Sequence, residues 1–138
     1  MRPETRTLPA RRDAIAPDGS EVRVLLALET FGSAAHFTLR AGHVSRAVVH
    51  TTVHEIWYVL EGRGRMWRSF GGREEVTPLR PGTCITLPFG TRFQFRASGT
   101  APLEILGVTM PPWPNTPDEA RVVDGKWKPS AASREKRP

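Results

Sequence analysis

The residues of this sequence best suited to chemistry are a histidine and a glutamate five positions apart, His50 and Glu55. Glu55 lies beside Ile56 and Trp57, where an unpaired carboxylate would be costly to bury. We therefore expect Glu55 to point into the fold and to have a hydrogen-bonding partner. Because an imidazole polarised by a carboxylate can act as a general base, His50 and Glu55 are the candidate catalytic pair.

A simpler interpretation of the same residues stays open. His50 and Glu55 can form a hydrogen-bonded pair that stabilises the fold and binds no ligand. Several large apolar side chains are candidates for the wall of a binding pocket, and they could equally fill the core. These candidate pocket residues are Trp57, Phe93, Phe95, Met110 and Trp113.

The elements that must position these residues are short strands. Between the two ends of the chain, strand-like runs alternate with turn signals at the spacing of an all-β sandwich or barrel. The expected strands are residues 22–29, 34–40, 46–50, 55–60, 64–70, 74–79, 83–87, 91–96 and 102–110. The only helix signal is short: Thr116 can cap a helix and Pro117 fits its first position.

Two of these strands indicate which side chains face inward, because neighbouring residues in a strand point to opposite faces. In residues 91–96, Phe93 and Phe95 share one face and the charged side chains share the other, so the aromatic face should be buried. In residues 55–60 both faces are largely apolar, whereas a sheet with one face in solvent normally has polar residues on that face. We expect the N-terminal arm or a second copy of the chain to cover the outer face.

Composition limits the function classes. The net charge of +6 lies at the ends of the chain, because residues 1–12 carry +3, residues 126–138 carry +4 and residues 13–125 carry −1. We therefore expect solvated, basic termini and no specific nucleic-acid partner. No apolar run approaches the roughly 20 residues needed to span a membrane. A single cysteine, Cys84, suits a reducing compartment, so we predict a cytoplasmic protein.

Two stretches of the sequence resemble the two motifs of the cupin superfamily. Residues 42–62 resemble G-x5-H-x-H-x3,4-E-x6-G, with His50, Glu55 and both glycines in place. Residues 82–97 resemble G-x5-P-x-G-x2-H-x3-N, but Phe93 stands at the histidine position and Ala97 at the asparagine position. Residues 22–125 as a whole are similar to a subgroup of small single-domain bacterial cupins.

The resemblance implies a fold and a domain organisation. The fold would be a double-stranded β-helix, a jelly-roll cupin barrel, over residues 21–114. An extended arm at residues 1–20 would precede it, and a short helix with a flexible basic tail would follow at residues 115–138. Small cupins of this kind are usually homodimers.

The resemblance also implies a divalent metal, since cupin motifs supply histidines and a glutamate that bind Fe, Mn, Ni, Cu or Zn. Here only His50 and Glu55 match ligand positions, so His54 and His36 would have to complete the set. Three functions follow. The barrel could hold a metal-dependent enzyme, such as a dioxygenase, isomerase or decarboxylase. It could hold a metal-free enzyme with His50 as the base, or it could be a non-catalytic sensor that binds a small organic ligand.

Overall fold

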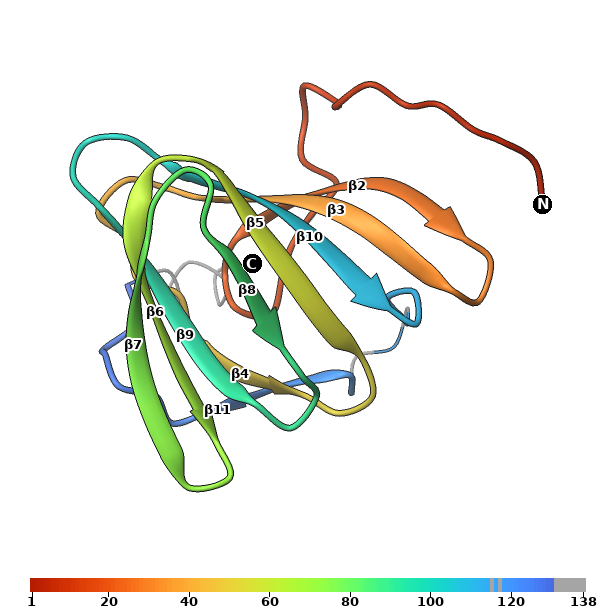
Figure 1. The fold of residues 1–138 in the computed structure, drawn as a ribbon. Coiled ribbons are helices and arrows are strands. Elements are labelled where there is room, and N and C mark those ends of the chain that lie inside the picture. Colours follow the sequence, from red (N-terminus) through yellow and green to blue (C-terminus); the bar gives the residue numbers. More distant parts are fainter. Residues whose placement is uncertain (115, 117, 131–138) are drawn as a thin grey trace, which may run out of the picture.

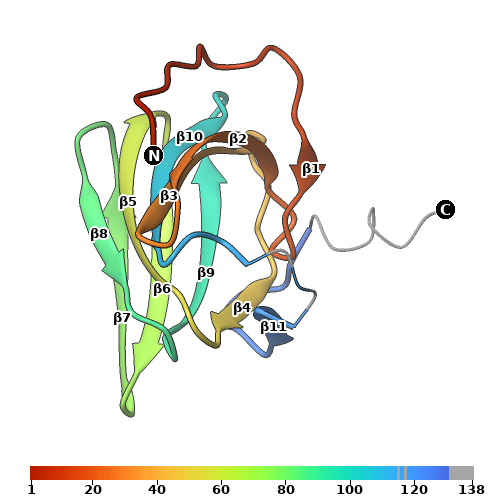
Figure 2. The same ribbon diagram turned by 90° about the vertical axis from the view of Figure 1, so that its right-hand side faces the viewer.

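The computed structural model describes residues 1–114, 116 and 118–130, which form two antiparallel sheets packed face to face (Figures 1 and 2). One sheet has the order β1-β2-β3-β10-β5-β8 and the other β11-β4-β9-β6-β7. Their strands are β1 (Ala14–Ile15), β2 (Glu21–Leu28), β3 (Gly32–Leu39), β4 (Ala47–His50), β5 (His54–Glu61), β6 (Arg63–Phe70), β7 (Arg73–Leu79), β8 (Cys84–Leu87), β9 (Arg92–Ser98), β10 (Leu103–Met110) and β11 (Ala120–Val123). The all-β jelly-roll prediction is confirmed.

All nine predicted strands are present, each with ends within two residues of the predicted ones. In β5 buried and exposed residues alternate along almost its whole length, although the sequence is largely apolar on both faces of this strand. The predicted facing of residues 91–96 is also right, because Phe93 and Phe95 are buried between the sheets. Gly71 and Gly72 form the turn between β6 and β7, both with positive φ.

The short helix expected from Thr116 is wrong, because the described residues of this segment contain no helix; Pro117 lies outside the described residues. The chain turns at Asp118 and continues as β11, which the sequence did not predict. Strand β11 pairs with β4, from Ala120 opposite His50 to Val123 opposite Ala47. A capping signal reports only on neighbouring residues, whereas pairing with a distant strand decides the conformation here.

The packed body extends beyond the expected barrel at both ends. Asp18 and Ser20, placed in the extended arm, are buried, and β1 pairs with β2. At the other end Ser130 hydrogen-bonds to the backbone of Val44. The rest of the predicted tail, 131–138, lies outside the described residues. Within the described ranges, no helix has the length and apolar character needed to cross a membrane.

The N-terminal arm does not cover the outer face of β5. It lies along β2, where Arg23 donates hydrogen bonds to the carbonyls of Pro9 and Ala10. Ile56 and Tyr58 on the outer face of β5 are 39% and 45% exposed in the single chain. Of the two coverings expected from the sequence, only a second copy of the chain is left as a prediction.

The core between the sheets is aromatic. The ring of Trp57 on β5 packs against Phe93 and Phe95 on β9 in edge-to-face contacts with centroid distances of 5.6 and 5.0 Å. Gly62, after β5, has φ +87°, and a Cβ there would lie 2.2 Å from the carbonyl oxygen of Pro102. Only glycine allows this close approach, which explains the last glycine of the first motif.

Candidate functional site

His50 and Glu55 lie on either side of the turn that joins the two sheets. His50 ends β4 and Glu55 is the second residue of β5. The turn brings His50 Nε2 to 2.8 Å from Glu55 Oε2, and their side chains are 7% and 2% exposed. The expected partnership of these two residues is therefore present between the sheets.

Glu55 has a second partner, Trp57. These two residues are two positions apart on β5, so their side chains share the inner face. The indole Nε1 of Trp57 donates a hydrogen bond to Glu55 Oε1, while Oε2 faces His50. Both carboxylate oxygens thus have partners, which offsets the cost of burying the group.

Glu119, which the sequence did not identify, holds the turn between β4 and β5. Its carboxylate accepts hydrogen bonds from the backbone amides of Thr51, Thr52 and Val53, and from the hydroxyls of both threonines. Burial alone would raise the pKa of Glu119, but these hydrogen bonds outweigh it and the pKa is lowered. An ionised Glu119 therefore fixes the backbone between the catalytic candidates.

The second ring nitrogen of His50, Nδ1, lies near Glu119. His50 Nδ1 is buried and has no hydrogen-bond partner among the described residues, and it lies 3.7 Å from Glu119 Oε2. The ring of Phe93 lies 5.4 Å from the imidazole, and the ring of Trp113 meets it edge-on at 5.0 Å. A doubly protonated His50 would have a carboxylate near each nitrogen.

Asp18 is a second residue that sequence reasoning missed. It is 6% exposed, and its Oδ1 accepts hydrogen bonds from the amide and hydroxyl of Ser20. Burial raises the pKa of the Asp18 carboxyl; the hydrogen bonds from Ser20 oppose this, and the Glu55 carboxylate raises it further. His50 acts in the opposite direction, so Asp18 belongs to the electrostatic environment of the pair.

The other two metal-ligand candidates do not join His50 and Glu55. His54 is exposed, and its Nδ1 accepts a hydrogen bond from the amide of Phe89. His36 faces away from the core beside Glu104, 3.1 Å from its carboxylate, and burial lowers its pKa. The described residues contain no group of three or more histidine, cysteine, aspartate or glutamate side chains placed to hold a metal ion. The donor set does not fit the usual cupin metal.

The predicted pocket residues divide into three groups. Trp57, Phe93 and Phe95 are at most 2% exposed and form the core. Trp113 is 39% exposed and covers one edge of His50. Met110 does not join them, because alternation along β10 puts Thr109 on the inner face beside Glu55 and Met110 on the outer face beside His54.

The comparisons with known proteins agree with the fold. The family model described as cupin domain matches residues 35–109, more than half of the chain. The chain belongs to the cupin family. The uncharacterized protein MJ1618 of Methanocaldococcus jannaschii is 32% identical over 103 residues, which span 72% of this chain and 79% of that protein.

Solved cupin-like structures show the same fold at low identity. A variant of PAC13 from Streptomyces, solved with uridine, matches with a TM-score of 0.70 at 19% identity, over 96% of this chain and 98% of that one. Pac13 is described as a nucleoside dehydratase. Oxalate decarboxylase matches with a TM-score of 0.62 at 21% identity, over 72% of this chain and 28% of that one. At these identities the likeness shows the fold alone.

Proposed function

We propose that this cupin binds a small organic molecule and acts on it by proton transfer without a metal, with His50 as the group that moves the proton. The observation that carries the proposal is the setting of the imidazole. One nitrogen is held by Glu55 at 2.8 Å, and the other is buried without a hydrogen-bond partner among the described residues. A general base needs a fixed orientation and a nitrogen that is not hydrogen-bonded, and Nδ1, 3.7 Å from the Glu119 carboxylate, makes no hydrogen bond to a described residue.

The surrounding side chains support different parts of this function. Glu55 orients the ring and can stabilise a positive charge on it, because a carboxylate favours the protonated form of a neighbouring histidine. Trp57 holds Glu55 in place through its indole nitrogen. Trp113 covers the ring edge and is partly exposed, so a displacement of Trp113 would open His50 to a ligand.

The class of reaction is proposed from the available groups. A histidine base with buried carboxylates can remove a proton from carbon and return one to a leaving group or to another carbon. Elimination of water and isomerisation need only these transfers. The structural neighbours include a nucleoside dehydratase and an oxalate decarboxylase, so nucleosides and small carboxylic acids are the first compounds to test.

Solvent deuterium exchange tests this proposal before the substrate is known. Compounds that raise the melting temperature would be incubated with the protein in D2O, and exchange at carbon would be followed by NMR. We expect the wild-type protein to catalyse exchange and His50→Gln to abolish it. Glu55→Gln should slow exchange by roughly 10²-fold or more. His54→Gln is the matched control, because His54 is exposed and belongs to the outer face.

Two results would contradict the catalytic proposal. Binding without exchange in the wild-type protein, with affinity weakened by Glu55→Gln, would show the non-catalytic binding module instead. Equal exchange rates in wild type and His50→Gln would remove His50 from the chemistry.

A further inference from the structure

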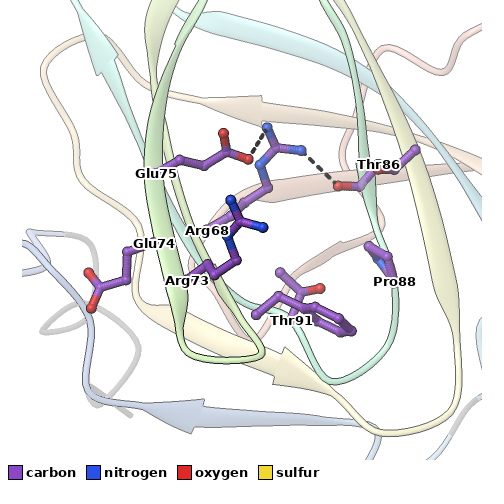
Figure 3. Close-up of a pocket in the computed structure, with 8 residues that line it drawn as sticks. Arg68, Arg73, Glu74, Glu75, Thr86, Pro88 and Thr91 are labelled. Carbon is purple, nitrogen blue, oxygen red and sulfur yellow. Dashed lines mark hydrogen bonds and ion pairs between the residues drawn. The ribbon is translucent and has the colours of Figure 1, made fainter.

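The structure has a surface recess whose lining residues do not include His50 or Glu55. It is a groove of about 440 Å³ between the β6–β7 hairpin of one sheet and the β8–β9 segment (Figure 3). This volume is within the range of small-molecule sites. Phe93 pairs with Val48 on the strand of His50 and with Arg68 on the strand that lines the groove.

The inner face of the β6–β7 hairpin changes character along its length. Met66 and Leu79 are buried in the core. Towards the hairpin turn, the same face carries Arg68 and Phe70 on β6, opposite Glu75 and Arg73 on β7. Charged side chains between two sheets are costly to bury, so this end of the sandwich stays open to solvent.

Arg68 crosses the groove and is already neutralised. Its guanidinium donates hydrogen bonds to the carbonyl of Thr86 on β8 and to the hydroxyl of Thr77 on β7. Its Nη2 also lies 3.1 Å from the carboxylate of Glu75. Figure 3 shows the contacts of Arg68 with Glu75 and with Thr86, and the contact with Thr86 joins the hairpin to the opposite sheet. Arg68 thus forms part of the site without contributing an unpaired charge.

The unpaired positive charge in the groove belongs to Arg73. Its side chain is exposed, and within the part of the chain that the structure describes it has no hydrogen bond or ion pair. The neighbouring acidic residue, Glu74, also borders the groove, but its carboxylate points to the other face (Figure 3) and accepts a hydrogen bond from the indole of Trp67. Arg73 is therefore available to a carboxylate, which a guanidinium can bind through two parallel hydrogen bonds.

The other lining residues favour a ligand with an apolar body. Phe70 is 54% exposed and its ring lies near Gly90 of the β8–β9 turn. Pro88 is exposed on the opposite wall. Thr91 is only 3% exposed, and its hydroxyl has no hydrogen-bond partner among the described residues.

We propose that this groove is a binding site for a small aromatic carboxylate. Arg73 binds the carboxylate, and Phe70 and Pro88 contact the ring. None of the residues that line the groove belongs to the His50–Glu55 pair, although the β8–β9 turn borders both, since the amide of Gly90 donates a hydrogen bond to the carbonyl of His50.

Titration with benzoate, followed by NMR of the protein, tests this site. We expect saturable shifts for Arg73, Phe70 and Thr91. Arg73→Gln should weaken benzoate binding at least tenfold. Arg65→Gln is the matched control, because Arg65 is exposed like Arg73 but lies on β6, on the outer face of the hairpin. Benzamide, which lacks the charge, should bind more weakly than benzoate, and His50→Gln should bind benzoate as the wild type does.

Three results would overturn the proposal. The first is the absence of saturable shifts at Arg73 and Phe70 at millimolar benzoate. The second is equal weakening by Arg73→Gln and Arg65→Gln. The third is equal binding of benzoate and inorganic phosphate, which would show that the apolar wall does not take part.

Discussion

Glu119 and His50 meet although they come from distant parts of the chain: Glu119 Oε2 lies 3.7 Å from His50 Nδ1. The contact depends on β11, because Ala120, the residue after Glu119, pairs with His50 itself. The same carboxylate accepts the amide hydrogen bonds of the turn that follows His50. The C-terminal segment is therefore part of the site, and not an appendage of the barrel.

Glu119→Gln should destabilise the protein by about 2–3 kcal/mol at neutral pH, because an amide has one acceptor oxygen and leaves donors of the turn unpaired. The pKa of Glu119 is lowered in the folded state. The stability that Glu119 contributes is therefore complete above its unfolded-state pKa of 4.5 and is lost as pH falls through its lower folded-state pKa. Urea unfolding of both proteins at several pH values would measure this.

The difference in the free energy of unfolding between wild type and Glu119→Gln should thus be constant near neutral pH and should shrink below about pH 4.5. Asp118→Asn is the control for charge, since Asp118 is exposed beside Glu119. An equal loss in both variants, or a difference that does not change with pH, would contradict the proposed clamp.

Trp57→Phe should destabilise the protein by about 2 kcal/mol, since it removes a hydrogen bond to a buried carboxylate and keeps most of the ring. Trp67→Phe removes a similar bond, from the indole to Glu74. Because Glu74 is exposed and water can replace the donor, the loss there should be nearer 0.5 kcal/mol. Denaturant unfolding of both variants measures these losses of stability, and equal losses would mean that the hydrogen bond from Trp57 is not needed to keep Glu55 buried.

The sequence predicted the barrel well because strand-like runs alternate with turn signals, and residues 91–96 also carry alternating aromatic and polar side chains. It also predicted the pairing of His50 with Glu55, since a carboxylate between apolar residues needs a partner. It could not predict Glu119 or Asp18 as neighbours of this pair. Both lie outside the expected barrel. Glu119 reaches the site because β11 pairs with β4, and Asp18 is held in the core by its hydrogen bonds with Ser20. No local sequence pattern indicates such distant contacts.

Asp18→Asn should stabilise the protein at neutral pH. Burial raises the pKa of Asp18, so folding favours its protonated form. The stability that Asp18 contributes is fully present below its unfolded-state pKa of 3.8. It is lost as pH rises through the higher folded-state pKa, because the buried carboxylate then ionises at a cost in free energy. Asparagine has no such cost and keeps an acceptor for Ser20.

Thermal unfolding across pH would measure the effect of Asp18→Asn. The advantage of the variant should be largest at neutral pH and vanish towards the unfolded value of 3.8. Asp124→Asn is the control, because Asp124 is exposed. A variant that is less stable than the wild type at neutral pH would show that the carboxylate is needed for another interaction.

The purified, untagged protein should contain much less than one divalent metal ion per chain, because Phe93 occupies the motif position of a ligand and His36 and His54 lie on the outer face. Plasma mass spectrometry of wild type and His50→Ala after incubation with Fe, Mn, Ni, Cu and Zn would test this. Near-stoichiometric metal that is lost in His50→Ala would contradict the metal-free proposal and reveal an unexpected ligand.

The chain should form a homodimer through the outer face of the six-stranded sheet. Ile56, Tyr58 and Leu60 on β5 are 39%, 45% and 40% exposed there, and adjacent exposed apolar residues of this kind mark interfaces. Ile56→Glu should therefore shift the protein towards the monomer in size-exclusion chromatography with light scattering. Val76→Glu is the matched control, since Val76 is β-branched and 36% exposed on the other sheet. A monomeric wild-type protein, or dissociation by Val76→Glu alone, would contradict this interface.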